Sequence, residues 1–169
     1  MSKLIRPIRV EGNRAYIPLT QGYVAIIDAA DVHLVDGRNW CAKVSRNAVY
    51  AMRRAVSGGK QRTIYLHRFI IDPPDDLQVD HCSGNGLDCR RANMRTATNT
   101  QNCCNRRISR ANTSGFKGVS WDDSSKKWLA TIGAGGKKIH LGYFASPEAA
   151  HVAYCEASAR LHGEFGRAA

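Results

Sequence analysis

The chain has 169 residues, enough for one medium domain or two small ones, and an aromatic content of 8% favours two small cores. No apolar run is long enough to span a bilayer, and the first ten residues lack the apolar region of a signal peptide. We therefore expect a cytosolic protein without a membrane partner. The net charge of +11 fits a polyanionic partner, although a merely basic surface would give the same sum.

In chain order, the first predicted elements are β-rich. They are a hairpin over 14–27 with its turn at 20–22, a short helix over 28–35, and strands over 48–53 and 62–67 joined by a glycine turn at 57–59.

A second group of elements follows the break at Pro73-Pro74. Residues 77–81 predict a short strand that leads into the glycine-rich turn 83–86, and residues 87–96 predict the returning strand. Thr98 is a suitable cap for a helix over 99–107. The order is therefore strand, turn, strand, helix.

The strand over 77–81 ends in Asp80 and His81, whose side chains should point to opposite sides because successive residues of a strand alternate. A histidine is suited to take a proton from water near neutral pH. Carboxylate and amide oxygens, as on Asp80 and Asn102, are ligands that suit Mg²⁺. This combination is typical of metal-dependent phosphodiester hydrolysis.

The stretch from Tyr65 to Asn102 resembles the ββα-metal core of HNH endonucleases, especially the phage and intron-encoded branch, with Asn in place of the more usual third His. The resemblance implies a DNA endonuclease that leaves 5′-phosphate and 3′-hydroxyl ends, in the host cytosol if phage-encoded. The residue roles that it implies are a general base (His81), a brace of the loop (Asn93), ligands of one Mg²⁺ or Mn²⁺ (Asp80 and Asn102), and contacts near the scissile phosphate (His67 and Arg68).

The six cysteines form no C-x-x-C pairs, so a structural zinc is not expected and reduced, packed thiols are preferred. A gathering of Cys82, Cys89, Cys103 and Cys104 around one ion is the alternative. Cys82 and Cys89 stand where the HNH family more often shows Ile and Asn, and neither position supplies a catalytic atom.

Basic side chains near this core are candidates for DNA contacts. Residues 1–112 hold 18 Lys and Arg against 9 Asp and Glu, and residues 113–169 hold 7 against 5. The polar and basic segment 108–114 predicts a linker. The candidate DNA contacts before this linker are Arg90, Arg91, Arg95, Arg106 and Arg107.

Residues 115–169 predict strands over 118–121, 128–132 and 138–143, and then a helix with Ser146 as N-cap, Pro147 in its first turn and Gly163 just past its end. Small or apolar residues recur on this helix at three- and four-residue steps. The helix-facing side of the sheet is predicted to carry Val119, Trp128, Ala130, Ile132, Ile139 and Leu141.

This C-terminal pattern resembles the AP2 domain, from Gly115-Phe116-Lys117-Gly118-Val119 to the Leu161–Phe165 stretch. The resemblance implies that the open face of the sheet reads the DNA major groove. Ser120, Gly133 and His140 stand where the plant pattern has Arg, Arg and Trp, which implies different base reading. The candidate DNA-binding residues here are Lys117, Ser120, Lys127, Thr131, Lys138 and His140.

The sequence thus predicts an α+β protein with an HNH nuclease domain (1–107), a basic linker (108–114) and an AP2-like domain (115–169). Double-stranded DNA is the expected partner, and one site per chain favours a monomer over a dimer. The two rival hypotheses are a non-catalytic DNA-binding or regulatory protein on an HNH scaffold, and an RNA-binding or RNA-cleaving protein. The sequence shows no aromatic stacking platform of the RRM kind.

Overall fold

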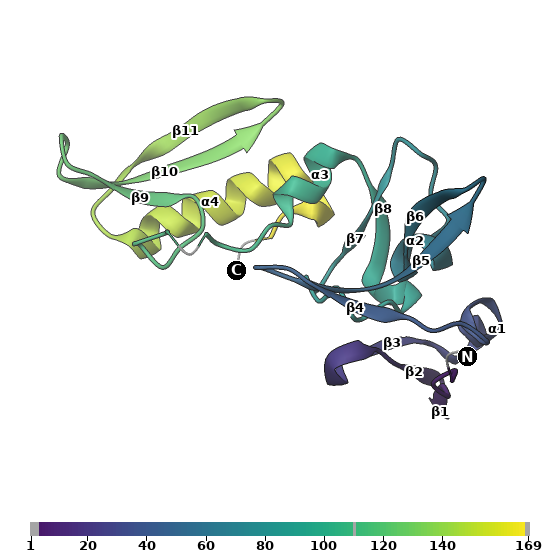
Figure 1. Ribbon diagram of the computed structural model, residues 1–169. Helices are drawn as coiled ribbons and strands as arrows, with labels where there is room; N and C mark the ends of the chain where they lie inside the picture. Colours follow the sequence, from purple (N-terminus) through teal and green to yellow (C-terminus); the bar gives the residue numbers. More distant parts are fainter. Residues whose placement is uncertain (1–3, 110, 168–169) are drawn as a thin grey trace. The chain divides into compact units, whose positions relative to one another are not determined.

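Small antiparallel sheets and short helices alternate along the chain in the computed structural model, which describes residues 4–109 and 111–167 (Figure 1). The chain divides into two units, Met1–Asn99 and Thr100–Ala169. The predicted linker 108–114 lies inside the second unit, and its Arg110 is outside the described residues, as are residues 1–3 and 168–169. The fold is α+β, as predicted.

Three sheets build the N-terminal unit. The strands β1 (Arg9–Glu11), β2 (Arg14–Pro18) and β3 (Val24–Asp28) form the first, β4 (Cys41–Val44), β5 (Val49–Ser57) and β6 (Lys60–Tyr65) the second, and β7 (Gln78–His81) with β8 (Met94–Ala97) the third. The helical segments are η1 (Thr20–Gly22), η2 (Ala29–Asp31), α1 (Val32–Val35), α2 (Leu66–Ile71) and η3 (Arg91–Asn93). The hairpin predicted over 14–27 is confirmed, with its turn at η1.

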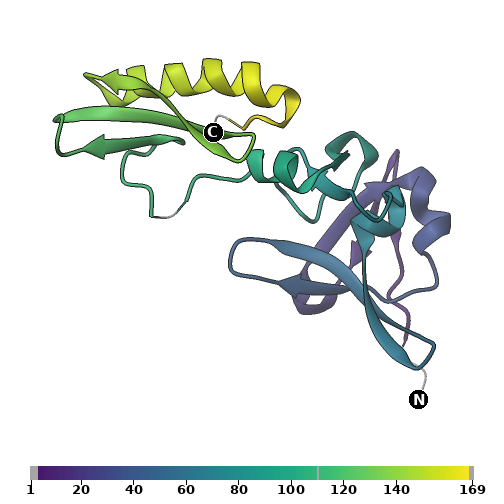
Figure 2. The same ribbon diagram turned by 90° about the horizontal axis from the view of Figure 1, so that it is seen from above.

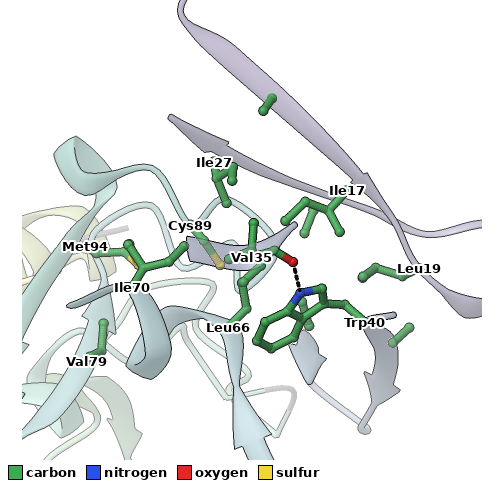
Figure 3. Close-up of a cluster of buried hydrophobic side chains, with 14 residues drawn as sticks. Ile17, Leu19, Ile27, Val35, Trp40, Leu66, Ile70, Val79, Cys89 and Met94 are labelled. Atoms are coloured by element: carbon green, nitrogen blue, oxygen red, sulfur yellow. Dashed lines mark hydrogen bonds between the residues drawn. The ribbon is translucent and has the colours of Figure 1, made fainter. Parts of the chain in front are cut away.

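One core joins the three sheets of this unit. Trp40 is fully buried, and its indole Nε1 donates to the Val35 carbonyl at 3.4 Å (Figure 3). Around it pack Ile17 and Ile27 from the first sheet and Leu66 from α2. The face of the second sheet that carries Ala42 and Ala51 belongs to the same core. The hydrophobic effect therefore holds three otherwise marginal sheets together.

The sequence prediction was wrong for residues 66–67, which begin the helix α2 rather than ending a strand. Leu66 and Ile70 are one helical turn apart and both are buried, so the helix points both side chains into the core. The helix ends at Asp72, which adopts the left-handed conformation just before Pro73. His67 is thereby placed on a helix.

The returning strand predicted over 87–96 is also shorter, because only Met94–Ala97 pairs with β7. Residues 87–89 instead bond to β3: the Ile26 amide donates to the Leu87 carbonyl and the Cys89 amide donates to the Ile26 carbonyl, both at 2.8 Å. The strands β1 and β4 were not predicted. The helix predicted over 99–107 is α3, which ends earlier (Asn99–Cys104).

The C-terminal unit is a three-stranded antiparallel sheet with a helix along one face, which Figures 1 and 2 show from two directions. Its elements are β9 (Val119–Asp122), β10 (Lys127–Ala134), β11 (Lys137–Phe144), α4 (Pro147–His162) and η4 (Gly163–Phe165). The predicted cap is confirmed, since the Ser146 hydroxyl accepts from the Ala149 amide at 3.2 Å. No helix among the described residues is long and apolar enough to cross a membrane.

Candidate active site

The candidate catalytic residues of the N-terminal unit lie at the end of the β7–β8 hairpin. Asp80 is 5% exposed and pairs across the hairpin with Arg95, while His81 is 6% exposed and pairs with Met94. The Arg95 guanidinium donates to Asp80 Oδ2 from Nε at 3.0 Å and from Nη2 at 2.8 Å. The carboxylate is therefore held in one orientation by a half-buried arginine.

His81 lies in an aromatic cluster with His67 and Tyr50. The His67 and His81 rings meet edge to face at 5.0 Å between centroids, and Tyr50 is 5.6 Å from His67 and 6.0 Å from His81. Tyr65 stacks on His67 at 5.4 Å. Two segments far apart in the sequence, β5–α2 and β7, thus place two imidazoles side by side.

Burial keeps both imidazoles neutral. It lowers the pKa of His67 to about 3, with smaller contributions from His81 and Arg68. It also lowers the pKa of His81, although Asp80 and Asp88 act in the opposite direction. His67 Nδ1 is buried without a hydrogen-bond partner. An unprotonated imidazole next to a carboxylate is able to accept a proton at neutral pH.

Asn93 holds the two ends of the loop after β7 together. Its Nδ2 donates to the Asp88 carbonyl at 2.8 Å, and its Oδ1 accepts from the Ser83 amide at 3.0 Å. Its own carbonyl accepts from the Cys82 amide at 2.8 Å. Such bonds fix the backbone that follows His81.

The glycine-rich turn lies against Tyr50. A Cβ built on Gly86 would be 2.6 Å from the Tyr50 ring and from the Val49 carbonyl oxygen, so a side chain at this position has no room. Tyr50 therefore contacts both this turn and the rings of the two histidines. Neither Tyr50 nor Tyr65 was predicted as a site residue, because nothing local in the strands β5 and β6 distinguishes them from core aromatics.

Arg68, the neighbour of His67 on α2, is half-buried and bonds within the N-terminal unit. Its guanidinium donates from Nη1 to the Leu77 carbonyl at 2.8 Å, which ties α2 to the start of β7. The two elements that carry His67 and His81 are therefore fastened to each other.

The three arginines predicted as DNA contacts in this unit are all paired with carboxylates. Arg90 makes two bonds to Asp88 at 2.7 and 2.8 Å, and this pairing lowers the pKa of Asp88. Arg91 bonds Asp31 at 2.9 and 3.0 Å and reaches the Ile70 carbonyl at 3.3 Å. Together with Arg95 on Asp80, they fasten the loop and the hairpin to the rest of the unit.

The remaining predicted residues near this point belong to the C-terminal unit. Asn102 is half-buried on α3, and Arg106 and Arg107 are exposed just after it. The Arg106 amide donates to the Cys103 carbonyl at 3.3 Å. All six cysteines are free thiols. Over residues 4–109 and 111–167, no three His, Cys, Asp or Glu side chains gather as a cluster of metal ligands.

In the C-terminal unit the strand register places most of the predicted DNA-binding residues on one face. Leu129 pairs with Ser120 and Tyr143, and Thr131 pairs with His140. Lys127 and Lys138 lie on the same side, because paired residues and alternate residues share a face. Asp122, paired with Lys127, adds one acidic group at the end of this face.

A β-bulge shapes this open face. Ala130 pairs with Gly142 and Thr131 with His140, so Leu141 is the extra residue, and it packs into the core on the helix side. The bulge brings His140 and Tyr143 together on the open face, with their rings 4.8 Å apart. Tyr143 is 47% exposed. An aromatic pair therefore stands among the lysines of this face.

Lys117 departs from the prediction that it lies on the open face. It precedes β9, and its ammonium donates to the carbonyls of Cys104 at 2.7 Å and Arg167 at 3.0 Å. Burial lowers the pKa of this lysine. Ile139, predicted on the helix side, pairs with Ile132 there but is still 37% exposed, because it lies near the outer end of the sheet.

Comparisons with known proteins show one curated relative that matches well. A stretch of 96 residues, 56% of this chain, is 35% identical to Protein 3.8 of Escherichia phage T7 and spans 77% of that protein. No protein-family profile and no solved structure matches the chain. At this identity and coverage, the chain belongs to the family of Protein 3.8 of phage T7.

Proposed function

We propose that this protein is an HNH-type endonuclease that hydrolyses phosphodiester bonds of double-stranded DNA with one divalent metal ion. The observation that carries the proposal is the neutral, buried His81 next to Asp80, at the end of a hairpin whose loop is clasped by Asn93. The order of hairpin and helix agrees with the resemblance to the ββα-metal core. Membership of a phage protein family is consistent with a phage origin.

In this proposal His81 accepts the proton of the attacking water. Its lowered pKa keeps the imidazole unprotonated at neutral pH, and the loop clasped by Asn93 limits its movement. Arg68, by tying α2 to β7, keeps His67 beside His81. His67 Nδ1 is buried without a partner, and a neutral imidazole can donate from one ring nitrogen, so DNA binding would have to uncover it before it could donate to a phosphate oxygen.

The proposed metal ligand of the N-terminal unit is of a kind that suits a hard divalent cation. Asp80 offers a carboxylate, and Mg²⁺ or Mn²⁺ keeps several waters beside its protein ligands. Arg95 shares the Asp80 carboxylate, so a cation there would lie beside a guanidinium. When bound, the ion would stabilise the charge that develops on the leaving 3′ oxygen.

The open face of β9–β11 is proposed to choose the DNA target. Lys127, Lys138 and His140 offer charge and hydrogen-bond donors, and Ser120 and Thr131 offer hydroxyls. A sheet of three strands can enter the major groove, where such side chains reach phosphates and base edges. The exposed segment with Arg106 and Arg107 supplies further positive charge to the same partner.

A second candidate is a non-catalytic DNA-binding protein on the same scaffold. It is favoured by the ion pair between Asp80 and Arg95 and by the 6% exposure of His81, since both features also suit a purely structural hairpin. Nicking of a supercoiled plasmid in Mg²⁺, compared with EDTA, distinguishes the two.

The test uses His81→Ala with His33→Ala as its matched control, since His33 is an exposed histidine of the same unit. Loss of a general base costs on the order of 10²–10⁴ in rate, so His81→Ala should abolish nicking while duplex binding in EDTA stays near the parental level. His33→Ala should cut like the parent. A purified His81→Ala protein that nicks at the parental single-turnover rate would exclude His81 as the base.

A further inference from the structure

The sheet β4–β6 has a charge pattern that the proposed site does not use. Residues 37–71 contain eight Lys and Arg and no Asp or Glu, so this stretch supplies eight positive charges in a chain whose net charge is +11. By contrast, Arg90, Arg91 and Arg95 are each paired with a carboxylate. The strongest uncompensated charge of the N-terminal unit therefore lies along this sheet and the helix α2.

Strand pairing divides the residues of this sheet between two faces. Ala42 and Ala51 pair with each other and are buried in the core, and this core face continues outward to Arg62 and Lys60 at the hairpin end. The opposite face, which we call the tyrosine face, carries Cys41, Lys43, Tyr50, Met52, Arg54, Val56, Gln61, Thr63 and Tyr65. Lys43, Arg54 and Thr63 are exposed.

The tyrosine face is continuous with the candidate active site. Tyr50 contacts the rings of both His67 and His81, and Tyr65 stacks on His67. The Lys43 ammonium donates to the Tyr65 hydroxyl and lies 5.0 Å from the centre of its ring. Lys43 therefore contacts Tyr65, which in turn stacks on His67 of the histidine pair.

We propose that the tyrosine face of β4–β6 is the surface on which duplex DNA lies as it reaches the His67–His81 site, with its phosphates along Lys43 and Arg54. This inference rests on the proposed nuclease function and names its substrate path. Lys43 is opposite Tyr50, so it lies about 13 Å from Arg54 along the strands, which corresponds to roughly four base pairs of duplex rise.

The chain offers a matched pair of double variants. Lys43→Gln/Arg54→Gln removes two positive charges from the tyrosine face, and Lys60→Gln/Arg62→Gln removes two from the other face of the same sheet. Binding of a 20–30 base-pair duplex, a length chosen to cover the sheet several times over, is measured for the full chain in EDTA at several salt concentrations. The dependence of log Kd on log salt reports how many phosphates are neutralised.

The tyrosine-face pair should lower the magnitude of this slope by about 1.8, because each phosphate contact contributes about 0.9. The control pair should leave the slope unchanged. Arg54→Lys, which keeps the charge, should bind like the parent, and thermal unfolding of all variants checks that they fold. Equal losses from the two pairs would overturn the proposal, and so would a parent protein that does not bind duplex DNA.

Two further outcomes separate this inference from the proposed function. If the tyrosine-face pair weakens DNA binding selectively but the parent never nicks DNA in Mg²⁺, the docking surface stands and the nuclease function fails. If the parent nicks and both pairs bind alike, the nuclease function stands and the docking surface fails. If the tyrosine-face pair weakens binding of an RNA duplex but not of a DNA duplex of the same sequence, then DNA is not the molecule that binds this face.

Discussion

The ion pair between Asp80 and Arg95 is the most buried pairing in the candidate site. The Asp80 side chain is 6% exposed and that of Arg95 16%. Two charges removed from water gain little overall, because the cost of desolvation offsets their attraction. Removing one partner is different, because it breaks a largely buried pair and typically costs more than the intact pair contributes. Asp80 therefore matters for stability as well as for the proposed metal binding.

We predict that Asp80→Ala destabilises the N-terminal unit by about 3–5 kcal/mol, because it breaks the largely buried ion pair with Arg95. The double variant Asp80→Ala/Arg95→Met should recover most of this loss. Urea unfolding measures both. Arg9→Ala is the comparison: the Arg9–Glu11 pair is 69% and 52% exposed, so its loss should barely move the midpoint. A midpoint of Asp80→Ala equal to that of Arg9→Ala would contradict the account.

His67 should make the stability of the protein depend on pH. Its pKa is about 3 in the folded chain, against about 6.5 when unfolded, so between these values only the unfolded state binds the proton. The stabilisation is present above the unfolded pKa and is lost as the pH falls below it, by about 1 kcal/mol per pH unit.

The test is His67→Phe, which keeps an aromatic ring beside Tyr65. Between pH 7 and pH 5 the parent should lose about 2 kcal/mol more stability in urea unfolding than this variant does. His33→Phe, at an exposed site, should keep the parental pH dependence. Parallel losses in the parent and in His67→Phe would show that His67 is not held neutral by burial.

At the scale of single elements, the C-terminal sheet requires a glycine where its first strand meets α4. A Cβ built on Gly118 would be 2.1 Å from the Tyr154 ring and 2.7 Å from the Thr131 carbonyl oxygen. Gly115 has almost the same backbone φ, +77° against +74°, yet a Cβ there meets nothing within 4 Å. A side chain would therefore meet the same backbone strain at both positions, but it would clash with neighbouring atoms only at Gly118.

Gly118→Ala should therefore destabilise the C-terminal unit by more than Gly115→Ala. Both substitutions carry a cost of about 1–2 kcal/mol for a left-handed residue, and overpacking at Tyr154 adds roughly 1–3 kcal/mol to the first. Thermal unfolding of the two variants gives the difference directly. Equal destabilisation would mean that Tyr154 moves aside at no cost.

The C-terminal elements could be predicted from the sequence because their signals are local. The Ser146 hydroxyl, Pro147 and Gly163 mark the two ends of α4 within a few residues of the chain. Alternation of apolar residues gave the three strands. The position of Lys117 could not be predicted from local signals, because it depends on the carbonyls of two residues far along the chain, Cys104 and Arg167.

In the N-terminal unit, the sequence pointed to Asp80, His81 and Asn93, which lie close together in the chain. It did not indicate the partners that tertiary structure brings to them. The Arg95 guanidinium is neutralised by Asp80, and the Tyr50 ring fills the space beside the two histidines. Residues 87–89 bond to β3 rather than extending the hairpin, and no local pattern signals such a bridge.

At the scale of the whole molecule, the two units have separate cores. One cluster of buried side chains draws its members from residues between Ala15 and Met94, and two others lie between Val119 and Ala157. Each unit therefore buries its own apolar surface, which is the physical requirement for a part to fold alone. The proposed chemistry and the proposed target reading are distributed between these parts, with Asn102 and α3 at the boundary.

Deleting residues 113–169 should leave a protein that still cuts DNA but no longer prefers the parental sites. The deletion keeps His81, Asp80 and α3 with Asn102, and it removes the face that carries Lys127, Lys138 and His140. Non-specific affinity should survive better than specificity, because residues 1–112 hold 18 basic groups against 9 acidic ones.

The measurement compares cleavage patterns of the full and truncated chains on one target-containing fragment at matched salt, after urea unfolding has shown that the truncated chain folds. The full-length variant Lys127→Gln/Lys138→Gln serves as a second arm, since it weakens the same face without removing any core. It should shift the pattern in the same direction as the truncation. An unchanged pattern in both would show that the sheet β9–β11 does not choose the target, because a reader must contact bases or phosphates at the sites it selects. Selection would then have to come from the N-terminal unit alone.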